Sequence, residues 1–327
     1  MYKAVSLFCG CGGADLGLLG GFTYNKQEYE KLPFEIIYAT DIDEKAVATY
    51  KKNFQGCTAV CADIKELDNS TIPACDILVG GFPCQSFSTV NPTKNPFDDR
   101  AQLYKEMAQV AEEKQPKIII AENVKGFKTL HGGSIFNTAI SEFEKKGYKA
   151  TSSLINASDY GVPQKRERII IVAVRKDIHN IKGDFKFPQK TTENNKVPLS
   201  VAVPKLDIED EKYYFSDRAV LGLKKAKNNM KRGLAQNLEE PCLTVTSHLA
   251  KTSLNSRDPV LLVDPEKELY RRFTPREAAR IQSFPDTFEF ADSEFDSYKQ
   301  IGNAIPPVMF WYIAKSVSDY LSNEAKK

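Results

Sequence analysis

The sequence lacks an apolar run long enough to span a membrane, and its amino terminus lacks the charged-then-apolar pattern of a secretory leader. We therefore expect a cytoplasmic protein without a membrane partner. Its 7 cysteines are an odd number and lie scattered along 327 residues. Because thiols stay reduced in the cytoplasm, we expect free thiols rather than a disulfide framework.

Cysteine pairs with the spacing of a metal site are also missing. Cys9 lies close to Cys11, and Cys57 lies close to Cys61. No histidine or second cysteine pair follows either of them at the spacing of a zinc site. We therefore predict that the protein binds no metal.

Net charge is small, at +2 at pH 7, and by itself says nothing about a nucleic-acid partner. Basic residues are nevertheless concentrated between positions 218 and 232, where no acidic residue occurs. They are Arg218, Lys224, Lys225, Lys227, Lys231 and Arg232. Such a run is usually a solvated helix face, and it becomes a candidate phosphate contact only if other features point to DNA.

Apolar segments typical of strands alternate with helical segments through the first half of the chain. The expected strands are residues 3–8, 34–39, 76–79 and 117–121, followed by a hairpin of residues 149–157 and 168–174. This alternation predicts an α/β fold with a mostly parallel sheet covered on both faces. Such folds bind a dinucleotide or nucleoside cofactor at a topological switch point.

The pattern changes at about residue 185, where the chain becomes polar, irregular and punctuated by prolines. Helical patterning resumes at Thr274, an expected N-cap, and a final helix begins near Pro306 and runs to the end. We therefore expect a first domain of residues 1–184, a smaller one of residues 185–272, and a return to the first domain in residues 273–327.

A single cysteine follows one of the expected strands. The segment GGFPCQ, residues 80–85, comes directly after the expected strand of residues 76–79, which is apolar from residue 77 onward. Open α/β sheets carry their chemistry at the carboxyl ends of strands, whereas a structural cysteine would more often lie inside the apolar run. Cys84 is therefore a candidate nucleophile.

A glycine cluster, FCGCGG at residues 8–13, separates the first strand from the first helix. Glycines allow a ligand to approach the backbone, and the following helix offers N–H groups to an anion, although a plain tight turn explains the cluster equally well. Asp41, at the tip of the second strand, is the kind of acid that binds ribose hydroxyls. Asp63 could accept a hydrogen bond from an adenine amino group. An ordinary helix N-cap remains the alternative for both aspartates.

Glu122 ends the strand that starts near residue 117, so it shares a sheet edge with Cys84. It is a candidate general acid if burial raises its pKa, and otherwise a solvated cap. Arg166 and Arg168 occupy alternate positions entering a strand and so point to one face. They form either a fork for a carbonyl or phosphate group, or a solvated strand edge.

Six motifs in fixed order then cover nearly the whole chain. They are FxGxGG (8–13), GGFPCQ (80–85), ENV (122–124), QxRxR (164–168), RExARIQSFP (276–285) and QIGNAIPP (300–307). This set resembles the bacterial DNA cytosine-5 methyltransferases of restriction-modification systems. Cys9 and Cys11 fill variable positions of the first motif. Asp41 stands where many members have Glu, and Ile42 stands where several have an aromatic residue that stacks on adenine.

The resemblance implies a Rossmann-like S-adenosylmethionine-dependent methyltransferase fold and a role for each catalytic candidate. Cys84 would add to carbon 6 of a cytosine that has been flipped out of the duplex. Glu122 would bind the ring nitrogen 3 and the exocyclic amine, while Arg168 would hold O2 with Arg166 nearby as support. S-adenosyl-L-methionine would supply the methyl group to carbon 5.

The resemblance also implies which residues contact the two ligands. Expected cofactor contacts are Phe8, Gly10, Gly12, Gly13, Asp41, Ile42, Asp63, Ile64, Pro83, Leu103, Asn303 and Ala304. Expected contacts to double-stranded DNA are Gln85, Ser86, Ser88, Gln164, Thr244 and Thr246. Residues 85–100 resemble the mobile active-site loop of the family, and residues 185–272 would form its target-recognition domain. We expect a monomer that forms no stable complex with a cognate restriction endonuclease.

Three other classes stay open. A tRNA cytosine-5 methyltransferase shares the chemistry and much of this motif set. A catalytically silent DNA-binding protein or repressor could use the same fold, although it would have no need to keep Cys84, Glu122 and Arg168. A small-molecule methyltransferase would need neither a flexible loop nor a separate recognition region.

Overall fold

The computed structural model describes residues 1–83, 103–227, 235–251, 258–291 and 293–322. Within these ranges, seven strands form one central sheet. In chain order they are β1 (Tyr2–Leu7), β4 (Phe34–Asp41), β5 (Thr58–Cys61), β6 (Ile77–Gly80), β7 (Ile118–Val124), β8 (Tyr148–Asn156) and β10 (Glu167–Arg175). Their order across the sheet is β5-β4-β1-β6-β7-β10-β8.

Pairing in this sheet is parallel from β5 through β7, and β10 then pairs antiparallel with both β7 and β8. The predicted α/β fold with a mostly parallel sheet is therefore confirmed. The strand order moves outward in one direction from β1 to β4 and β5, and in the other from β6 to β7, so the switch point lies beside β1.

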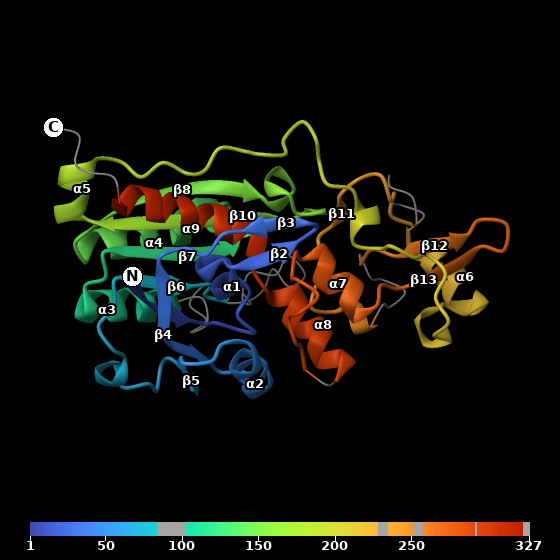
Figure 1. Cartoon of the computed structure of the whole chain (residues 1–327), viewed down its shortest axis with the longest axis horizontal. Helices are drawn as coiled ribbons and strands as arrows, with labels where there is room; N and C mark the ends of the chain where they lie inside the picture. Colours follow the sequence, from blue (N-terminus) through green and yellow to red (C-terminus); the bar gives the residue numbers. More distant parts are fainter. Residues whose placement is uncertain (84–102, 228–234, 252–257, 292, 323–327) are drawn as a thin grey trace.

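The helices are distributed along the whole chain (Figure 1). They are α1 (Gly13–Leu19), α2 (Glu44–Asn53), α3 (Leu103–Lys114), α4 (Ser134–Lys145), α5 (Lys176–Lys182), α6 (Asp217–Lys227), α7 (Pro275–Ile281), α8 (Glu294–Asn303) and α9 (Pro307–Ser322). The hairpin of β2 (Phe22–Tyr24) and β3 (Gln27–Tyr29), together with α5 and α8, lies in segments for which the sequence analysis named no element.

Both faces of the sheet are buried. Successive residues of a strand point to opposite faces, so each strand contributes side chains to two cores. On β7, Ile118 and Ile120 pack into a core cluster that includes α1 and α9. Ile119 and Ala121 pack into a second cluster with α3 and α4. The near-continuous apolar runs of these strands follow from this two-sided burial.

Residues 185–272 contain few regular elements, as the loss of periodicity predicts. Beyond α6 they include β11 (Cys242–Leu243), which pairs parallel with β9 (Gln164–Lys165), and a hairpin of β12 (Leu261–Asp264) and β13 (Leu269–Arg271). In Figure 1, α6, β12 and β13 lie at the end of the molecule away from both termini, and α7 and α8 lie between them and the sheet.

A third core cluster joins this irregular region to the helices around it. Leu199 and Cys242 pack there with Val47 of α2, Ala278 of α7 and Ile301 of α8. In the part of the chain that the structure describes, no helix has the length and apolar character of a membrane span.

Candidate active site

The carboxyl ends of the parallel strands meet at one edge of the sheet. Leu7 of β1 is level with Thr40 of β4, and Gly80 of β6 is level with Ala121 of β7. The ends of these strands and the segments that follow them carry the glycine cluster, Asp41, residues 80–83 and Glu122. The structure therefore brings these predicted site segments to a single edge.

The glycine cluster turns sharply between β1 and α1. Gly12 has a φ of 95°, and a Cβ atom there would lie 2.1 Å from the ring of Phe54. A Cβ atom on Gly13 would lie 2.5 Å from the carbonyl oxygen of Ile305. Gly10 also has a positive φ, and a Cβ atom there would meet no described atom within 4 Å. Phe8 shares this left-handed conformation, with a φ of 55°. The backbone of the cluster is thus packed closely against other residues at Gly12 and Gly13, whereas space remains beside Gly10.

Asp41 fixes the position of this turn. Its carboxylate accepts hydrogen bonds from the backbone N–H of Gly10 at 2.8 Å and of Asp43 at 2.9 Å. Burial raises the pKa of the Asp41 carboxyl above its ordinary value, although these hydrogen bonds oppose the effect. The adjacent Ile42 is 67% exposed, so it presents an apolar surface directly after Asp41.

Three other predicted cofactor contacts lie at the same edge or close to it. Asp63 follows β5 and accepts a hydrogen bond from the backbone N–H of Lys65 at 3.0 Å, as a turn-capping residue does. The side chains of Ile64 and Leu103 are buried in the cluster that contains α3 and α4.

The chain that leads to the candidate nucleophile is described up to Pro83. A Cβ atom on Gly81 would lie 3.3 Å from Oε2 of Glu122, so this segment passes directly beside that carboxylate. The buried side chain of Asn123 donates a hydrogen bond to the carbonyl oxygen of Phe82 at 3.0 Å. The predicted residues Cys84, Gln85, Ser86 and Ser88 lie outside the described residues.

Glu122 and Arg168 form an ion pair across two strands. Nε of Arg168 lies 2.9 Å from Oε1 of Glu122, and the two side chains are 13% and 12% exposed. Because Arg168 is level with Val124 on antiparallel strands, it is a diagonal neighbour of Glu122 on the same face. Burial raises the pKa of Glu122 even though Arg168 and Arg166 act in the opposite direction.

Arg166 has a different environment from Arg168. Its side chain is buried, and its terminal nitrogens donate to the carbonyl oxygens of Val245, Gly302 and Ala304 at 3.0–3.1 Å. These bonds direct the guanidinium to the backbone of two other segments. Arg166 is therefore a positioning residue in this structure rather than an open fork for a ligand.

Gln164, predicted as a DNA contact, is completely buried. Its Oε1 accepts from the backbone N–H of Val245 at 2.8 Å, and its Nε2 donates to Oε1 of Gln282 at 2.6 Å. Both ends of the amide are therefore bonded to protein, and the side chain has no surface to offer DNA. The sequence alone does not indicate this burial, because alternation along a strand does not show what covers each face.

Thr244 and Thr246 lie in the segment that contains β11. The hydroxyl of Thr244 donates to the carbonyl oxygen of Lys165 at 3.0 Å, and that of Thr246 donates to the Asp258 carboxylate at 2.6 Å. The backbone at Thr246 also contacts Gly302, where a Cβ atom would lie 2.2 Å from the Thr246 carbonyl carbon. Gly302 directly precedes the predicted cofactor contacts Asn303, which is exposed, and Ala304, which is buried.

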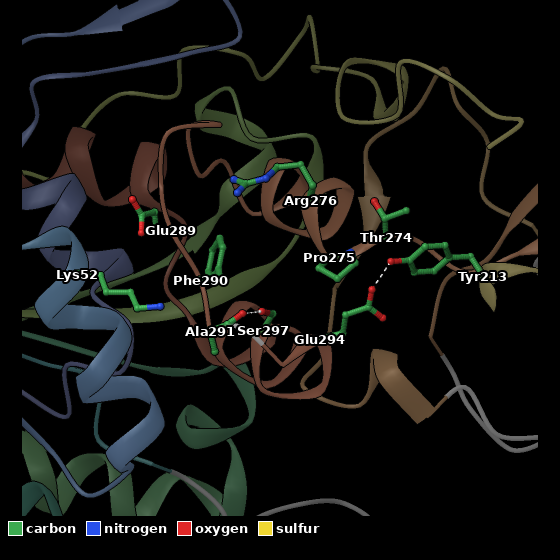
Figure 2. Close-up of a pocket in the computed structure, with 10 residues that line it drawn as sticks. All are labelled: Lys52, Tyr213, Thr274, Pro275, Arg276, Glu289, Phe290, Ala291, Glu294 and Ser297. Atoms are coloured by element: carbon green, nitrogen blue, oxygen red, sulfur yellow. Dashed lines mark hydrogen bonds between the residues drawn. The ribbon is translucent and has the colours of Figure 1, made fainter. Parts of the chain in front are cut away.

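A cavity of about 480 Å³ lies elsewhere, between α2, α7, α8 and Tyr213 (Figure 2). Two of its charged groups already have protein partners: Glu294 accepts from the Tyr213 hydroxyl, and Arg276 donates to the carbonyl oxygen of Phe288. Among the described residues, none of those predicted for the site lines it. Within the described ranges, no cluster of His, Cys, Asp or Glu is arranged to hold a metal ion.

Two buried amides belong to this region although the sequence analysis gave them no role. They are Asn123, which supports the backbone before Cys84, and Gln282, which bonds Gln164. Both stand inside the quoted motifs ENV and RExARIQSFP. The sequence contained one indication of such a role: each amide stands next to apolar residues, and an amide that is buried with them needs hydrogen-bond partners.

Comparison with known proteins agrees with this geometry. A family model described as C-5 cytosine-specific DNA methylase matches residues 2–319. The Type II methyltransferase M.FnuDI of Fusobacterium nucleatum is 33% identical over 99% of this chain and 96% of its own length. M.NlaX of Neisseria lactamica, also a Type II methyltransferase, is 33% identical over 98% of each chain.

Solved structures show the same fold. A putative DNA modification methyltransferase encoded within an E. coli prophage superposes with a TM-score of 0.74 at 24% identity, over 99% of this chain and 100% of its own. The Dnmt2 methyltransferase of S. pombe also superposes with a TM-score of 0.74, at 19% identity and the same coverage. With the family matched over nearly its whole length, this chain belongs to the C-5 cytosine-specific DNA methylases and is a DNA cytosine-5-methyltransferase.

Proposed function

We propose that this enzyme methylates carbon 5 of a flipped-out cytosine within a specific duplex DNA sequence, by way of a covalent bond between Cys84 and carbon 6. The observation that carries the proposal is the Glu122–Arg168 pair, which lies directly beside Gly81, three residues before Cys84. A carboxyl group and a guanidinium on one face suit the two polar edges of a cytosine: N3 with its amino group, and O2.

The chemistry explains these residue types. Carbon 5 of cytosine is a weak nucleophile, but a bond from the Cys84 thiolate to carbon 6 moves an electron pair to carbon 5. A protonated Glu122 donates a hydrogen bond to N3 and accepts one from the exocyclic amine, so negative charge on the ring is stabilised as it develops. The raised pKa of Glu122 favours this protonated form. Carbon 5 uses this electron pair to take the methyl group, and removal of the carbon-5 proton then re-forms the double bond and expels the Cys84 sulfur with its electron pair.

The methyl donor that we propose is S-adenosyl-L-methionine, which supplies an electrophilic methyl group when bound. The residues at the edge of the sheet fit it. The turn at Gly10 is open where a side chain would stand, and the exposed Ile42 offers an apolar surface for adenine. Asp41 lies between the two and suits the ribose hydroxyls. Phe8, Gly12 and Gly13 shape the turn.

The DNA target lies within the duplex, so the cytosine has to leave the base stack before Cys84 can reach it. This extrusion costs a few kcal/mol, which contacts with the pocket and backbone offset. We propose that residues 185–272 are the target-recognition domain, that Thr244 and Thr246 belong to its reading surface, and that Arg218 and Lys225 of α6 contact phosphates. We further propose a monomeric cytoplasmic enzyme of a restriction-modification system.

The first experiment expresses the chain in cells and applies bisulfite sequencing to plasmid DNA. We expect full methylation of one cytosine within a short recurring sequence. In parallel, methyl incorporation from S-adenosyl-L-methionine is measured on duplex DNA and on tRNA. Incorporation into tRNA alone would assign the enzyme to RNA, and no incorporation into either would favour a silent DNA-binding protein.

The covalent step has its own test. A duplex with 5-fluorocytosine at the target position cannot lose a proton from carbon 5, so the Cys84 adduct should persist in denaturing gels. Cys84→Ser should form no such adduct and transfer no methyl group, while it still binds DNA. Undiminished turnover by Cys84→Ser would remove Cys84 from the mechanism.

A further inference from the structure

Three fully buried polar side chains connect segments that are far apart in the sequence. They are Gln164, Arg166 and Gln282, with exposed fractions of 0%, 2% and 0%. We call these three residues, which carry two amides and one guanidinium, the hub. One side of the hub holds residues 241–246, the recognition element, and the other side holds residues 302–304, the donor-side segment.

On the recognition side, the hub holds both backbone polar groups of Val245. The Val245 N–H donates to Oε1 of Gln164 at 2.8 Å, and the Val245 carbonyl oxygen accepts from Nη1 of Arg166 at 3.1 Å. Because all these groups are buried, the loss of either bond would leave a polar group without a partner. Val245, between Thr244 and Thr246, is therefore fixed to β9 and to Arg166, the residue that directly precedes the strand of Arg168.

In the donor-side segment, two side chains of the hub donate hydrogen bonds to the carbonyl oxygen of Ala304. This oxygen accepts from Nη2 of Arg166 and from Nε2 of Gln282, each at 3.0 Å. Gln282 also donates to the carbonyl oxygen of Ile301 at 2.6 Å, and Arg166 also donates to that of Gly302 at 3.0 Å. The end of α8 is therefore fixed by the same side chains that fix Val245.

The hydrogen bonds that pass through the two glutamines form a chain in which every donor points the same way, from Val245 towards Ala304. Val245 N–H donates to Gln164, the Gln164 amide donates to Gln282, and the Gln282 amide donates to Ala304. Reversal of either amide would place oxygen against oxygen, so the orientation of each fixes the next. The contact of Gly302 with the backbone at Thr246 brings the same two segments together independently.

We propose that Gln282 is a positioning residue that couples target recognition to methyl-donor binding, an inference that rests on the proposed function. Its single side chain orients Gln164, which holds the recognition element, and bonds Ala304 in the donor-side segment. A shift of residues 244–246 against DNA therefore changes the bonds available to residues 302–304. Occupation of one site changes the affinity of the other by the same factor.

The experiment measures this coupling directly. S-adenosylhomocysteine is titrated into the enzyme by calorimetry, with and without a duplex that carries the sequence found by bisulfite sequencing. In the wild-type enzyme we expect the duplex to change the S-adenosylhomocysteine Kd by about 5-fold or more, within the usual range of coupling between sites.

The decisive variant is Gln282→Met, which keeps the length of the side chain and introduces no buried charge. We expect the effect of the duplex on the S-adenosylhomocysteine Kd to fall towards a factor of 1, because the side chain at position 282 no longer connects Gln164 to Ala304. Gln282→Glu provides a second variant: it keeps an acceptor for Gln164 but loses the donors to Ile301 and Ala304. Gln115→Glu, at the surface beyond α3, is the matched control and should keep the wild-type coupling.

Several results would overturn the inference. They are a wild-type enzyme that methylates DNA without coupling, a folded Gln282→Met with unchanged coupling, or a variant that weakens donor binding equally with and without DNA. The last result would make the hub a static scaffold. A wild-type enzyme that methylates no nucleic acid would instead refute the proposed function, so the two failures are distinguishable.

Discussion

Glu122 and Arg168 lie diagonally across two antiparallel strands, with Nε of the arginine 2.9 Å from the carboxylate. Neither strand is at an edge of the sheet, and both side chains of the pair are largely buried. Burial still raises the pKa of Glu122, because desolvation of its charge outweighs the attraction of the arginines. The same carboxyl group can therefore be held by Arg168 and remain able to take up a proton.

Replacement of Glu122 by Gln tests the role of that proton. The amide preserves the shape but cannot move between protonation states, and we expect kcat to fall by at least about 100-fold. Single-turnover methylation of the cognate duplex measures this. Glu28→Gln, at the exposed hairpin of β2 and β3, is the control and should be neutral. A near-normal rate for Glu122→Gln would remove Glu122 from catalysis.

Replacement of Gly302 by Ala tests the contact between the donor-side segment and the recognition element. The new Cβ atom would lie 2.2 Å from backbone atoms of Thr246 and Ser247, so one segment has to shift. We expect a loss of about 1–3 kcal/mol in the free energy of unfolding, together with a loss of methylation activity.

Gly147→Ala is the matched control for that substitution. Gly147 has a φ of 96° and no described neighbour within 4 Å of an added Cβ atom. It should lose about 1–2 kcal/mol through backbone strain alone and keep its activity. Equal activity of the two variants, measured at a temperature where both are folded, would show that the contact at Gly302 has no functional role.

The pH dependence of stability should reflect Asp15, a completely buried residue of α1 that accepts a hydrogen bond from the Ser6 hydroxyl at 2.9 Å. Burial raises the pKa of its carboxyl from 3.8 to about 7. The folded state therefore keeps this proton to a higher pH than the unfolded chain. Its stabilising effect is complete below about pH 4 and is lost as the pH rises through about 7.

Urea unfolding between pH 5 and pH 8 measures this effect. The contribution of Asp15 should decline with a limiting slope of about 1.4 kcal/mol per pH unit. Asp15→Asn removes the titrating group, so its free energy of unfolding should decline less over the same interval. An identical pH dependence in the two proteins would contradict the prediction.

Replacement of Ile42 by Trp tests the assignment of the donor pocket. Ile42 is 67% exposed beside Asp41, and an aromatic ring there could stack on adenine. Such contacts contribute about 0.5–1.5 kcal/mol, so we expect the S-adenosylhomocysteine Kd to fall about 2- to 10-fold. Ile181→Trp, at a 63% exposed position of α5, controls for a general gain in apolar surface. Equal tightening in both variants would argue against adenine at Ile42.

Most of the central sheet could be predicted from the sequence. The runs that became β1, β4, β6 and β7 are apolar because each strand is buried on both faces, and such runs are visible without a structure. The capped start of α7 was also visible, since Thr274 and Pro275 have local preferences for these positions. The short strands β9 and β11 were not, because two-residue pairings between distant segments leave no periodicity.

Within the site, the sequence indicated which residues matter better than it indicated what they do. Arg166 was expected as support for Arg168 and Gln164 as a contact to DNA; both are buried and bonded to protein. Alternation along a strand predicts which side chains share a face, but the partners on that face come from residues 245, 282 and 304. Those contacts span from 79 to 138 positions in the chain, and no local pattern encodes them.

The sequence by itself determined the set and the order of the motifs by which the chain resembles one family of enzymes. It also determined most of the central sheet, since apolar strand segments that alternate with helical segments favour a covered, mostly parallel sheet. Only the tertiary structure decided that Arg168 pairs with Glu122 whereas Arg166 holds the backbone. Two arginines two positions apart have the same intrinsic chemistry, and what each one binds depends on the groups that folding brings within hydrogen-bond distance.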